Sequence, residues 1–392
     1  MRKKSNKYTS PLALYVIWHP DFIEGKFYAE KVFSAFCRNI ENPLGRSSNI
    51  PVYFRSKANQ VTGIPIDIQY DEADKNAILL LVDDKMFADD NWQIYVQNLA
   101  ANKATNTRIF PVAFSEYSYH IDNENLNQIQ FIRAKDIKKI DENETNAERW
   151  KLIRSRLLHD IGRQLLNVPE VYNVEKVDDP PVQLFLSHAK KDGEDIAKMF
   201  RDYIESNSKL NTFFDTNDIA DGHSFKQEIT KHLENSAVII FNTDEYSSRE
   251  WCRREVIIAK RFRCPILCVL DIKNGETRSF PYSGNVPTII WNNNIEEIIN
   301  QTLIQLINNT YSKLLLEKIK ILYKVENSLV LPKAPELFNY IDIEELKKNK
   351  VYKDDLIVLY PEPPLGIEEI MLLNDIDKKI NFITPVQLAT FI

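Results

Sequence analysis

The chain has 392 residues, 44% of them hydrophobic, and a formal net charge of −6 at pH 7. This length is enough for roughly two or three domains with ordinary cores, and the acidic balance provides no basic surface for a nucleic-acid backbone. The longest apolar runs are far too short to span a membrane, and the N-terminus lacks the apolar core of a signal peptide. We therefore expect a cytoplasmic protein with no nucleic-acid or membrane partner.

Cysteine and glycine exclude further kinds of site. Four cysteines are too few for a disulfide framework, and none stands in a metal-binding CxxC pair, so we expect four reduced thiols. The nine glycines are too widely separated to form GxGxxG or the GxxxxGK of a phosphate-binding loop. Any nucleotide must therefore be bound in another way.

One order of elements occurs twice along the chain. The first pass predicts strands at 12–18, 50–54, 77–82, 108–114 and 129–132, a helix after the first strand and a helix at about 148–166. The second pass predicts strands at 182–187, 211–215, 236–241, 265–270 and 287–291, with helices near 196–204, 224–234 and from Ile295.

These patterns predict an α/β protein. Continuously apolar strands that alternate with amphipathic helices indicate, in each pass, a doubly wound, flavodoxin-like parallel sheet of five strands. The expected domains are 1–166, a proline-marked linker at 167–181, 182–310, and a small α/β region at 311–392 that begins with a separate helix from Ser312 to Lys324. Ligands bind such sheets at the carboxyl ends of the strands, where three loops of the second domain should meet.

The first of these loops is SHAKKDGED (187–195), which leads into a helix N-terminus, where backbone N–H groups and the dipole favour an anion. Lys190 and Lys191 add positive charge, although a solvated loop with Asp192 as helix cap explains the pattern equally well. The adjacent Ser187 and His188 point to opposite faces of a strand, so we do not expect them to act as nucleophile and base.

The second loop is DTNDIADGHSF (215–225). Asp215, Asp218 and His223 could suggest a metal site. Acidic loops are more often solvated or cap a helix, and we expect no metal here.

The third loop, SSREWCRREV (247–256), starts a helix near Ser248. Glu250 and Arg254 are four residues apart, which predicts an ordinary exposed ion pair. Glu255 has no such partner on its own helix and stands beside Trp251, at the rim of the apolar face that Cys252, Val256 and Ala259 form. It is either a functional carboxylate or a glutamate whose partner lies on another element.

The motifs LFLSHAKKDGEDIA, NTFFDTNDIADGHSF and SAVIIFNTDEYSSREWCRREV, in this order and spacing, resemble the bacterial branch of the TIR (Toll/interleukin-1 receptor) domain over about 182–310. Many members of that family cleave NAD⁺ at the nicotinamide–ribose bond and self-associate. The resemblance implies that Glu255 is the catalytic residue, that NAD⁺ is the substrate and that no cofactor is needed. The residues expected to bind the substrate are Trp251, Ser187, His188, Lys190, Lys191, Asp215 and Phe225.

One carboxylate suffices for this chemistry, because nicotinamide leaves as a neutral molecule and only the ribosyl cation needs stabilisation. We expect Trp251 to shield Glu255 from water, and the lysines after Ser187 to hold the pyrophosphate. Capture of the cation by water would give ADP-ribose, and capture by an adenine nitrogen would give a cyclic product. The residues do not distinguish these outcomes.

The first pass keeps a tryptophan, Trp92, but four residues later has Val96 where the second pass has Glu255. We therefore interpret it as a divergent, non-catalytic TIR-like domain, with an unrelated α/β domain as the alternative. The leading hypothesis is a bacterial antiphage NAD⁺ glycohydrolase or cyclase that is activated by a nucleotide signal or a phage-derived activator. A non-enzymatic scaffold that self-associates, and a nucleotide-signal sensor, remain open.

Overall fold

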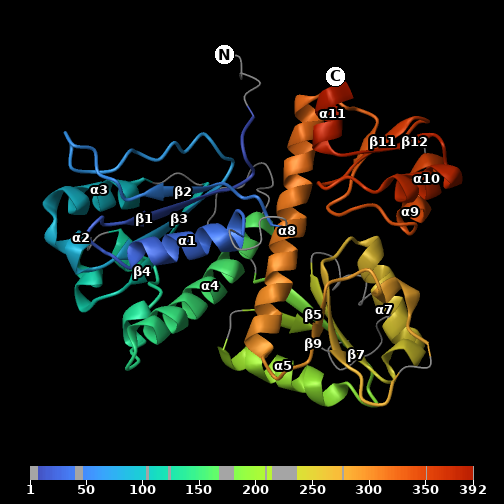
Figure 1. Cartoon of the computed structure of the whole chain (residues 1–392), viewed down its shortest axis with the longest axis horizontal. Coiled ribbons are helices and arrows are strands. Elements are labelled where there is room, and N and C mark those ends of the chain that lie inside the picture. Colours follow the sequence, from blue (N-terminus) through green and yellow to red (C-terminus); the bar gives the residue numbers. More distant parts are fainter. Residues whose placement is uncertain are drawn as a thin grey trace. The chain divides into compact units, whose positions relative to one another are not determined.

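The computed structural model describes residues 8–39, 47–102, 106–121, 125–166, 181–207, 210–213, 236–275, 278–349 and 351–391. The chain forms two compact units, residues 1–161 and 162–392 (Figure 1). All four cysteines are free thiols. Among the described helices, none combines the length and the apolar character needed to cross a membrane.

The first unit is a parallel sheet covered by helices. Its strands are β1 (Ala13–Trp18), β2 (Val52–Arg55), β3 (Asn76–Val82) and β4 (Thr107–Ala113), in the order β2-β1-β3-β4. Its helices are α1 (Gly25–Phe36), α2 (Asp84–Ala88), α3 (Asp90–Ala101) and α4 (Glu142–Leu166), the last of which continues into the second unit. Strands β1 and β3 are buried along their whole length, as their apolar runs predict.

This first sheet has four strands in the described ranges, not the five expected. The segment predicted as its fifth strand contributes a single bridge, between Ile132 and Val112. Pairing ends there because the chain turns into a short 3₁₀ helix at Ala134–Asp136 immediately afterwards.

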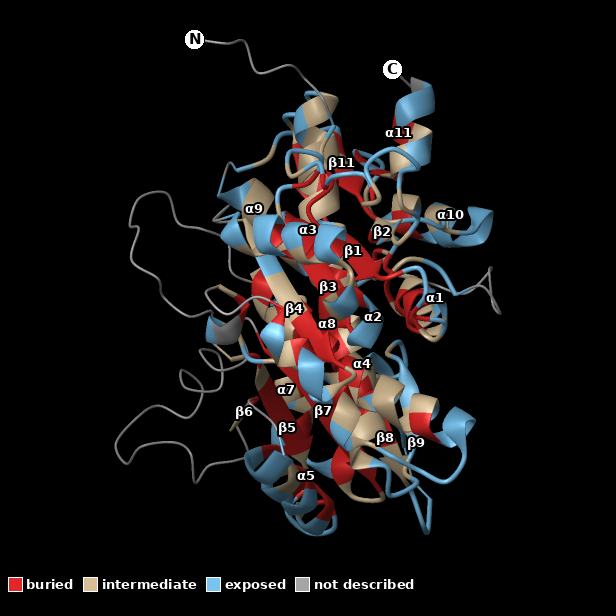
Figure 2. Ribbon diagram, turned by 90° about the vertical axis from the view of Figure 1, so that its left-hand side faces the viewer, coloured by how far each residue is buried: buried red, intermediate tan, exposed pale blue. Residues whose placement is uncertain are grey.

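The second unit contains the predicted five-stranded parallel sheet. Its strands are β5 (Gln183–His188), β6 (Asn211–Phe213), β7 (Ala237–Thr243), β8 (Ile266–Asp271) and β9 (Thr288–Ile290), in the order β6-β5-β7-β8-β9. Strand β7 is buried throughout and β5 through its centre (Figure 2). The predicted second loop, the helix expected at 224–234 and nearly all of the predicted linker lie outside the described residues.

Helices cover both faces of this sheet, so it is doubly wound. Helix α7 (Glu250–Arg261) packs its buried residues in one core cluster with Val238, Ile240 and Ile266 of the strands. Helix α5 (Glu194–Asn207) covers the opposite face, where Phe200 contacts Phe241 at 4.9 Å between ring centroids. Side chains that alternate along each strand therefore serve two separate layers.

The C-terminal region is the small α/β unit expected. It contains β10 (Ser328–Val330), α9 (Asn339–Lys348), β11 (Leu356–Leu359), α10 (Ile367–Ile376), β12 (Ile380–Ile383) and α11 (Pro385–Phe391), with a parallel sheet in the order β10-β11-β12. The prediction of a separate helix from Ser312 is wrong. These residues form the C-terminal part of one 28-residue helix, α8 (Ile295–Leu322), because no glycine or proline interrupts that stretch. The domain boundary expected at 310 falls inside this helix.

Candidate active site

The carboxyl end of β5 and the start of α7 form the candidate site. After β7, residues Tyr246–Ser248 make a 3₁₀ turn, and α7 begins at Glu250 with Arg249 as its N-cap, two residues later than Ser248. Cys252, Val256 and Ala259 are buried, as predicted. Glu255 is therefore held at the edge of the apolar stripe.

Glu255 has its hydrogen-bond partner on another element. Ser187 is the last residue but one of β5. Its hydroxyl donates a hydrogen bond to Oε2 of Glu255 at 2.5 Å. The Ser187 oxygen also lies 2.6 Å from the Tyr246 hydroxyl. Ser187 is 1% exposed and Tyr246 is fully buried, whereas Glu255 is half-buried. The carboxylate is thus both partnered across the sheet edge and partly accessible.

Two titratable groups near Glu255, Tyr246 and Cys252, stay neutral at pH 7. Burial, with smaller contributions from Cys252 and Glu255, raises the pKa of Tyr246 well above its usual value. Burial first and the Glu255 charge second raise the pKa of Cys252 to about 12. Because both are acids with raised pKa values, both remain protonated, and neither adds charge beside the carboxylate.

Trp251 lies on the outer side of α7, with 48% of its surface exposed. The Arg254 guanidinium lies over its ring, 4.7 Å from the centroid, and pairs with Glu250 at 2.5 Å, which confirms the predicted surface ion pair. The side chain of Trp251 is thus more exposed than the predicted role of shielding Glu255 requires. Tyr246 is not among the residues predicted from the sequence, where its signal is a bulky aromatic residue shortly after a buried strand.

The loop after β5 is tied to the loop after β7. Asp192 accepts hydrogen bonds from the Thr243 hydroxyl at 2.8 Å and from the Glu245 backbone N–H at 3.0 Å, so its carboxylate joins the two loops. Lys191 pairs with Glu245, and this hydrogen bond is the main cause of the lowered pKa of Glu245. Lys190 is exposed.

Ser187 and His188 engage different partners, as their alternation along a strand predicts. The half-buried His188 places Nδ1 3.2 Å from the Leu186 carbonyl. The two remaining predicted substrate-binding residues, Asp215 and Phe225, lie outside the described residues. Across the part of the chain that the structure describes, no cluster of His, Cys, Asp and Glu is arranged to hold a metal ion.

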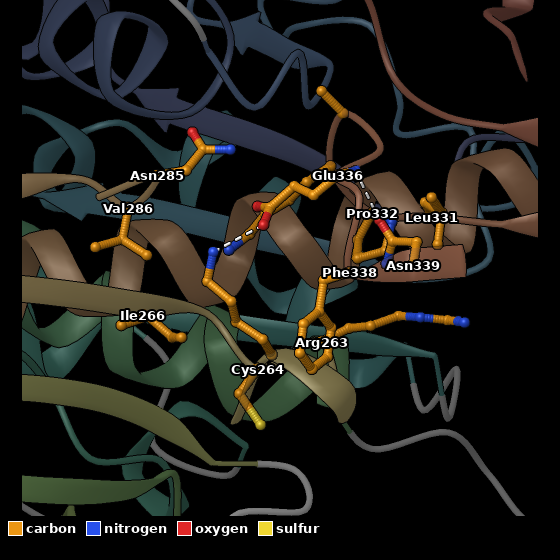
Figure 3. Close-up of a pocket in the computed structure, with 13 residues that line it drawn as sticks. Arg263, Cys264, Ile266, Asn285, Val286, Leu331, Pro332, Glu336, Phe338 and Asn339 are labelled. Atoms are coloured by element: carbon orange, nitrogen blue, oxygen red, sulfur yellow. Dashed lines mark hydrogen bonds and ion pairs between the residues drawn. The ribbon is translucent and has the colours of Figure 1, made fainter. Parts of the chain in front are cut away.

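A small cavity lies further along α7, where the helix meets the C-terminal region (Figure 3). Lys260 pairs there with Glu336 at 2.8 Å, and Arg263 bonds the Val330 carbonyl at 3.3 Å. The cavity volume is about 40 Å³, which is room for little more than a water molecule. This cavity is therefore too small for a dinucleotide.

Fold and site together define a doubly wound parallel α/β domain with one carboxylate at the carboxyl edge of its sheet. Residues 184–286 match the sequence profile of the TIR domain, so the chain contains a TIR domain. Ser187, Tyr246, Trp251 and Glu255 all lie within this match. The match begins at β5, and the TIR-like character of the first unit therefore stays a prediction.

Solved structures give more distant likenesses. The activated Roq1 resistosome that recognises the pathogen effector XopQ (TIR domains) is 17% identical over 32% of this chain and 84% of that chain, with a TM-score of 0.22. A metazoan TIR-STING receptor from C. gigas is 17% identical over 35% of this chain and 43% of that chain, with a TM-score of 0.24. The same receptor in complex with 2′,3′-cGAMP is 13% identical over 52% of this chain and 62% of that chain, with a TM-score of 0.25. This chain thus covers less than two thirds of that receptor.

At these identities and TM-scores, the likenesses carry no argument about activity. A search of curated proteins found no match.

Proposed function

We propose that the TIR domain cleaves NAD⁺ at the nicotinamide–ribose bond, with Glu255 as the catalytic residue. The observation that supports this most is the Glu255 carboxylate at the carboxyl edge of a TIR-domain sheet, fixed by Ser187 at 2.5 Å. Ligands of open parallel sheets bind at this edge. A half-buried carboxylate there can reach a bound ribose.

In the proposed reaction, the C–N bond breaks and its electron pair goes to the nicotinamide nitrogen, which neutralises the pyridinium. The leaving group needs no general acid, so the second carboxylate of a glycosidase is unnecessary. The ribosyl cation needs negative charge, which Glu255 supplies beside the neutral Tyr246 and Cys252. Water or an adenine nitrogen captures the cation and loses a proton to solvent. The reaction needs no cofactor besides the substrate.

The pyrophosphate of NAD⁺ is proposed to lie by the loop between β5 and α5. Lys190 is exposed there, and the N-terminus of α5 offers backbone N–H groups. Glu194 and Asp195 in the first turn, and the pairing of Lys191 with Glu245, reduce the positive potential of this loop. We therefore expect this loop to bind the phosphates with moderate rather than high affinity.

The proposed setting is bacterial antiphage defence, in which activity depends on self-association of TIR domains and on a nucleotide signal or a phage-derived activator. The resemblance of the motifs to the bacterial branch of the family supports this setting. Specific activity should therefore rise with protein concentration. A fully active monomer at nanomolar concentration, shown by mass measurement, contradicts the requirement for assembly.

The deciding experiment measures nicotinamide release from NAD⁺ by the purified protein, alone and with a lysate of phage-infected cells. Glu255→Gln should lower the release by about a thousandfold or more, because it removes the charge that the cation needs. Glu250→Gln is the matched control on the same helix and should retain activity within a few-fold. Absence of release under both conditions, or equal loss in the two variants, refutes the proposal.

A further inference from the structure

Three oxygen atoms from three separate elements of the TIR domain form a hydrogen-bonded line at the candidate site. The Tyr246 hydroxyl, in the turn after β7, lies 2.6 Å from Ser187 Oγ on β5. Ser187 Oγ lies 2.5 Å from Glu255 Oε2 on α7. Tyr246 and Ser187 are 0% and 1% exposed, so this line runs from the interior of the domain to its accessible carboxylate.

With Glu255 ionised, as the proposed reaction requires, the protons on this line can be arranged in one direction only. An ionised carboxylate has no proton, so the Ser187 hydroxyl donates to Glu255. The Ser187 oxygen then accepts from the Tyr246 hydroxyl, which stays protonated because burial raises the pKa of that tyrosine. A hydrogen bond to an ionised acceptor is stronger than a neutral one, and a buried chain of such bonds is polarised along its length.

The first unit shows that the fold does not need a serine at this place. Strands β1 and β5 hold the same position in their sheets, and Ile17 pairs with Leu80 as Ser187 pairs with Ile240. Ile17 is fully buried and apolar. A hydroxyl in the buried layer of the second sheet is therefore an addition that requires its own explanation.

We infer that Tyr246 and Ser187 are positioning residues that hold the Glu255 carboxylate in the orientation needed at the ribose. This inference rests on the proposed NAD⁺ cleavage. It also changes the role expected for Ser187, because a side chain that is 1% exposed acts on the substrate through Glu255. Tyr246 acts one step further away, and within the described part of the chain its hydroxyl bonds only to Ser187.

The test is a double-mutant cycle on kcat and KM for NAD⁺ in the full chain, with Tyr246→Phe, Ser187→Ala and both together. Each single variant should lower kcat by about tenfold or more with little change in KM, because it removes a hydrogen bond that orients a charged group. The double variant should lose no more than Ser187→Ala alone, since Tyr246 acts only through the serine.

Two variants separate positioning from general loss of packing. Tyr340→Phe removes a buried tyrosine hydroxyl that bonds the Leu373 carbonyl, and Ser328→Ala removes a buried strand serine that bonds the Val325 carbonyl at 2.7 Å. Both lie in the C-terminal region of the same unit, and both should keep kcat unchanged. A similar loss in these controls, unchanged kcat in the site variants, or losses that multiply in the double variant overturn the inference. A raised KM with normal kcat would instead make Ser187 a substrate contact and overturns it too.

Failure of the proposed function has a different signature. If wild-type protein releases no nicotinamide, NAD⁺ cleavage is refuted, and the hydrogen-bonded chain is judged by thermal unfolding of the same variants. The decreases in Tm for Tyr246→Phe and Ser187→Ala should then sum to more than the decrease in the double variant. Additive decreases show that the two hydroxyls act separately, which overturns the chain itself.

Discussion

The carboxyl edges of the two sheets have one framework and different side chains. Ile17 pairs with Leu80, and α3 begins ten residues after Leu80, at Asp90. In the same way, Ser187 pairs with Ile240, and α7 begins ten residues after Ile240, at Glu250. Tyr95 is the sixth residue of α3, and Glu255 is the sixth residue of α7. The polar line Tyr246–Ser187–Glu255 thus corresponds to Met86, Ile17 and Tyr95, which are buried members of one core cluster.

This correspondence corrects the sequence-based alignment of the two domains. Trp92 and Trp251 suggest that Val96 stands in the place of Glu255, but Trp92 is the third residue of its helix and Trp251 the second. One residue is about 100° of helix rotation. Trp92 therefore enters the core, 1% exposed and 5.2 Å from the His19 ring, whereas Trp251 stays on the surface at 48%. Cys252 therefore corresponds to Trp92. The prediction that Val96 corresponds to Glu255 is wrong.

The comparison teaches that the polar side chains at the edge of a sheet are separable from the sheet that carries them. The first unit uses the edge position for packing, and no carboxylate occupies the counterpart of Glu255. Its non-catalytic role remains a prediction, now based on Tyr95 instead of Val96. One irregularity remains in the first unit: among the described residues, the buried Tyr95 hydroxyl has no hydrogen-bond partner.

The largest expected effect comes from giving the first unit the carboxylate of the second. Tyr95→Glu buries a charge in the core cluster of Ile17 and Met86, where the nearby charge of Arg55 offsets only part of the cost, and should destabilise the protein by about 3–5 kcal/mol. Urea unfolding measures this. Ile94→Glu, one residue earlier and 55% exposed, should cost less than about 0.5 kcal/mol. Equal costs for the two variants would show that Tyr95 does not occupy a closed core position.

The next largest effect is a difference between the two tryptophans. Trp92→Ala opens a cavity in the first core and should cost about 3–5 kcal/mol. Trp251→Ala removes a half-exposed ring and its contact with Arg254, which should cost about 1 kcal/mol or less. Thermal unfolding of both variants compares them directly. A larger loss for Trp251→Ala would contradict the one-residue shift between the helices.

A smaller effect, of opposite sign, is expected for Tyr95→Phe. Removing a buried hydroxyl without a partner should stabilise the first unit by about 1 kcal/mol, because its desolvation cost disappears. Tyr246→Phe, at a hydroxyl that is bonded to Ser187, should destabilise. Differential scanning fluorimetry resolves both signs. Destabilisation by Tyr95→Phe would mean that this hydroxyl has a partner in solution.

The smallest effect is expected on the exposed face of α7. Glu250→Ala removes the pair with Arg254, an i,i+4 interaction worth about 0.3 kcal/mol on a helix surface. Its effect should shrink further in 0.5 M salt, since an exposed pair is screened. A loss that persists in salt would indicate that Glu250 has a second, buried role.

Much of the fold could be predicted. Spacing along one helix left Glu255 without a partner on that helix, and the resemblance to the TIR family then pointed to it as the catalytic residue, which stays a prediction. The same method could not find Tyr246 or the bond from Ser187, since those residues meet Glu255 only across β5, the turn after β7 and α7. The strand predicted at 287–291 forms β9, whereas the strand predicted at 129–132 forms only one bridge, because the chain turns after Ile132 and ends the pairing.

The sequence by itself determined the alternation of strands and helices, the TIR motifs and the isolation of Glu255 on its own helix. These depend on periodicity and spacing within a segment, which are properties of the chain alone. Tertiary structure decided which tryptophan is buried, that α8 continues through the expected boundary, and that Tyr246 and Ser187 reach the carboxylate. Such contacts join residues 59 and 68 positions apart, and only the packing of strand, turn and helix brings their atoms within 3 Å.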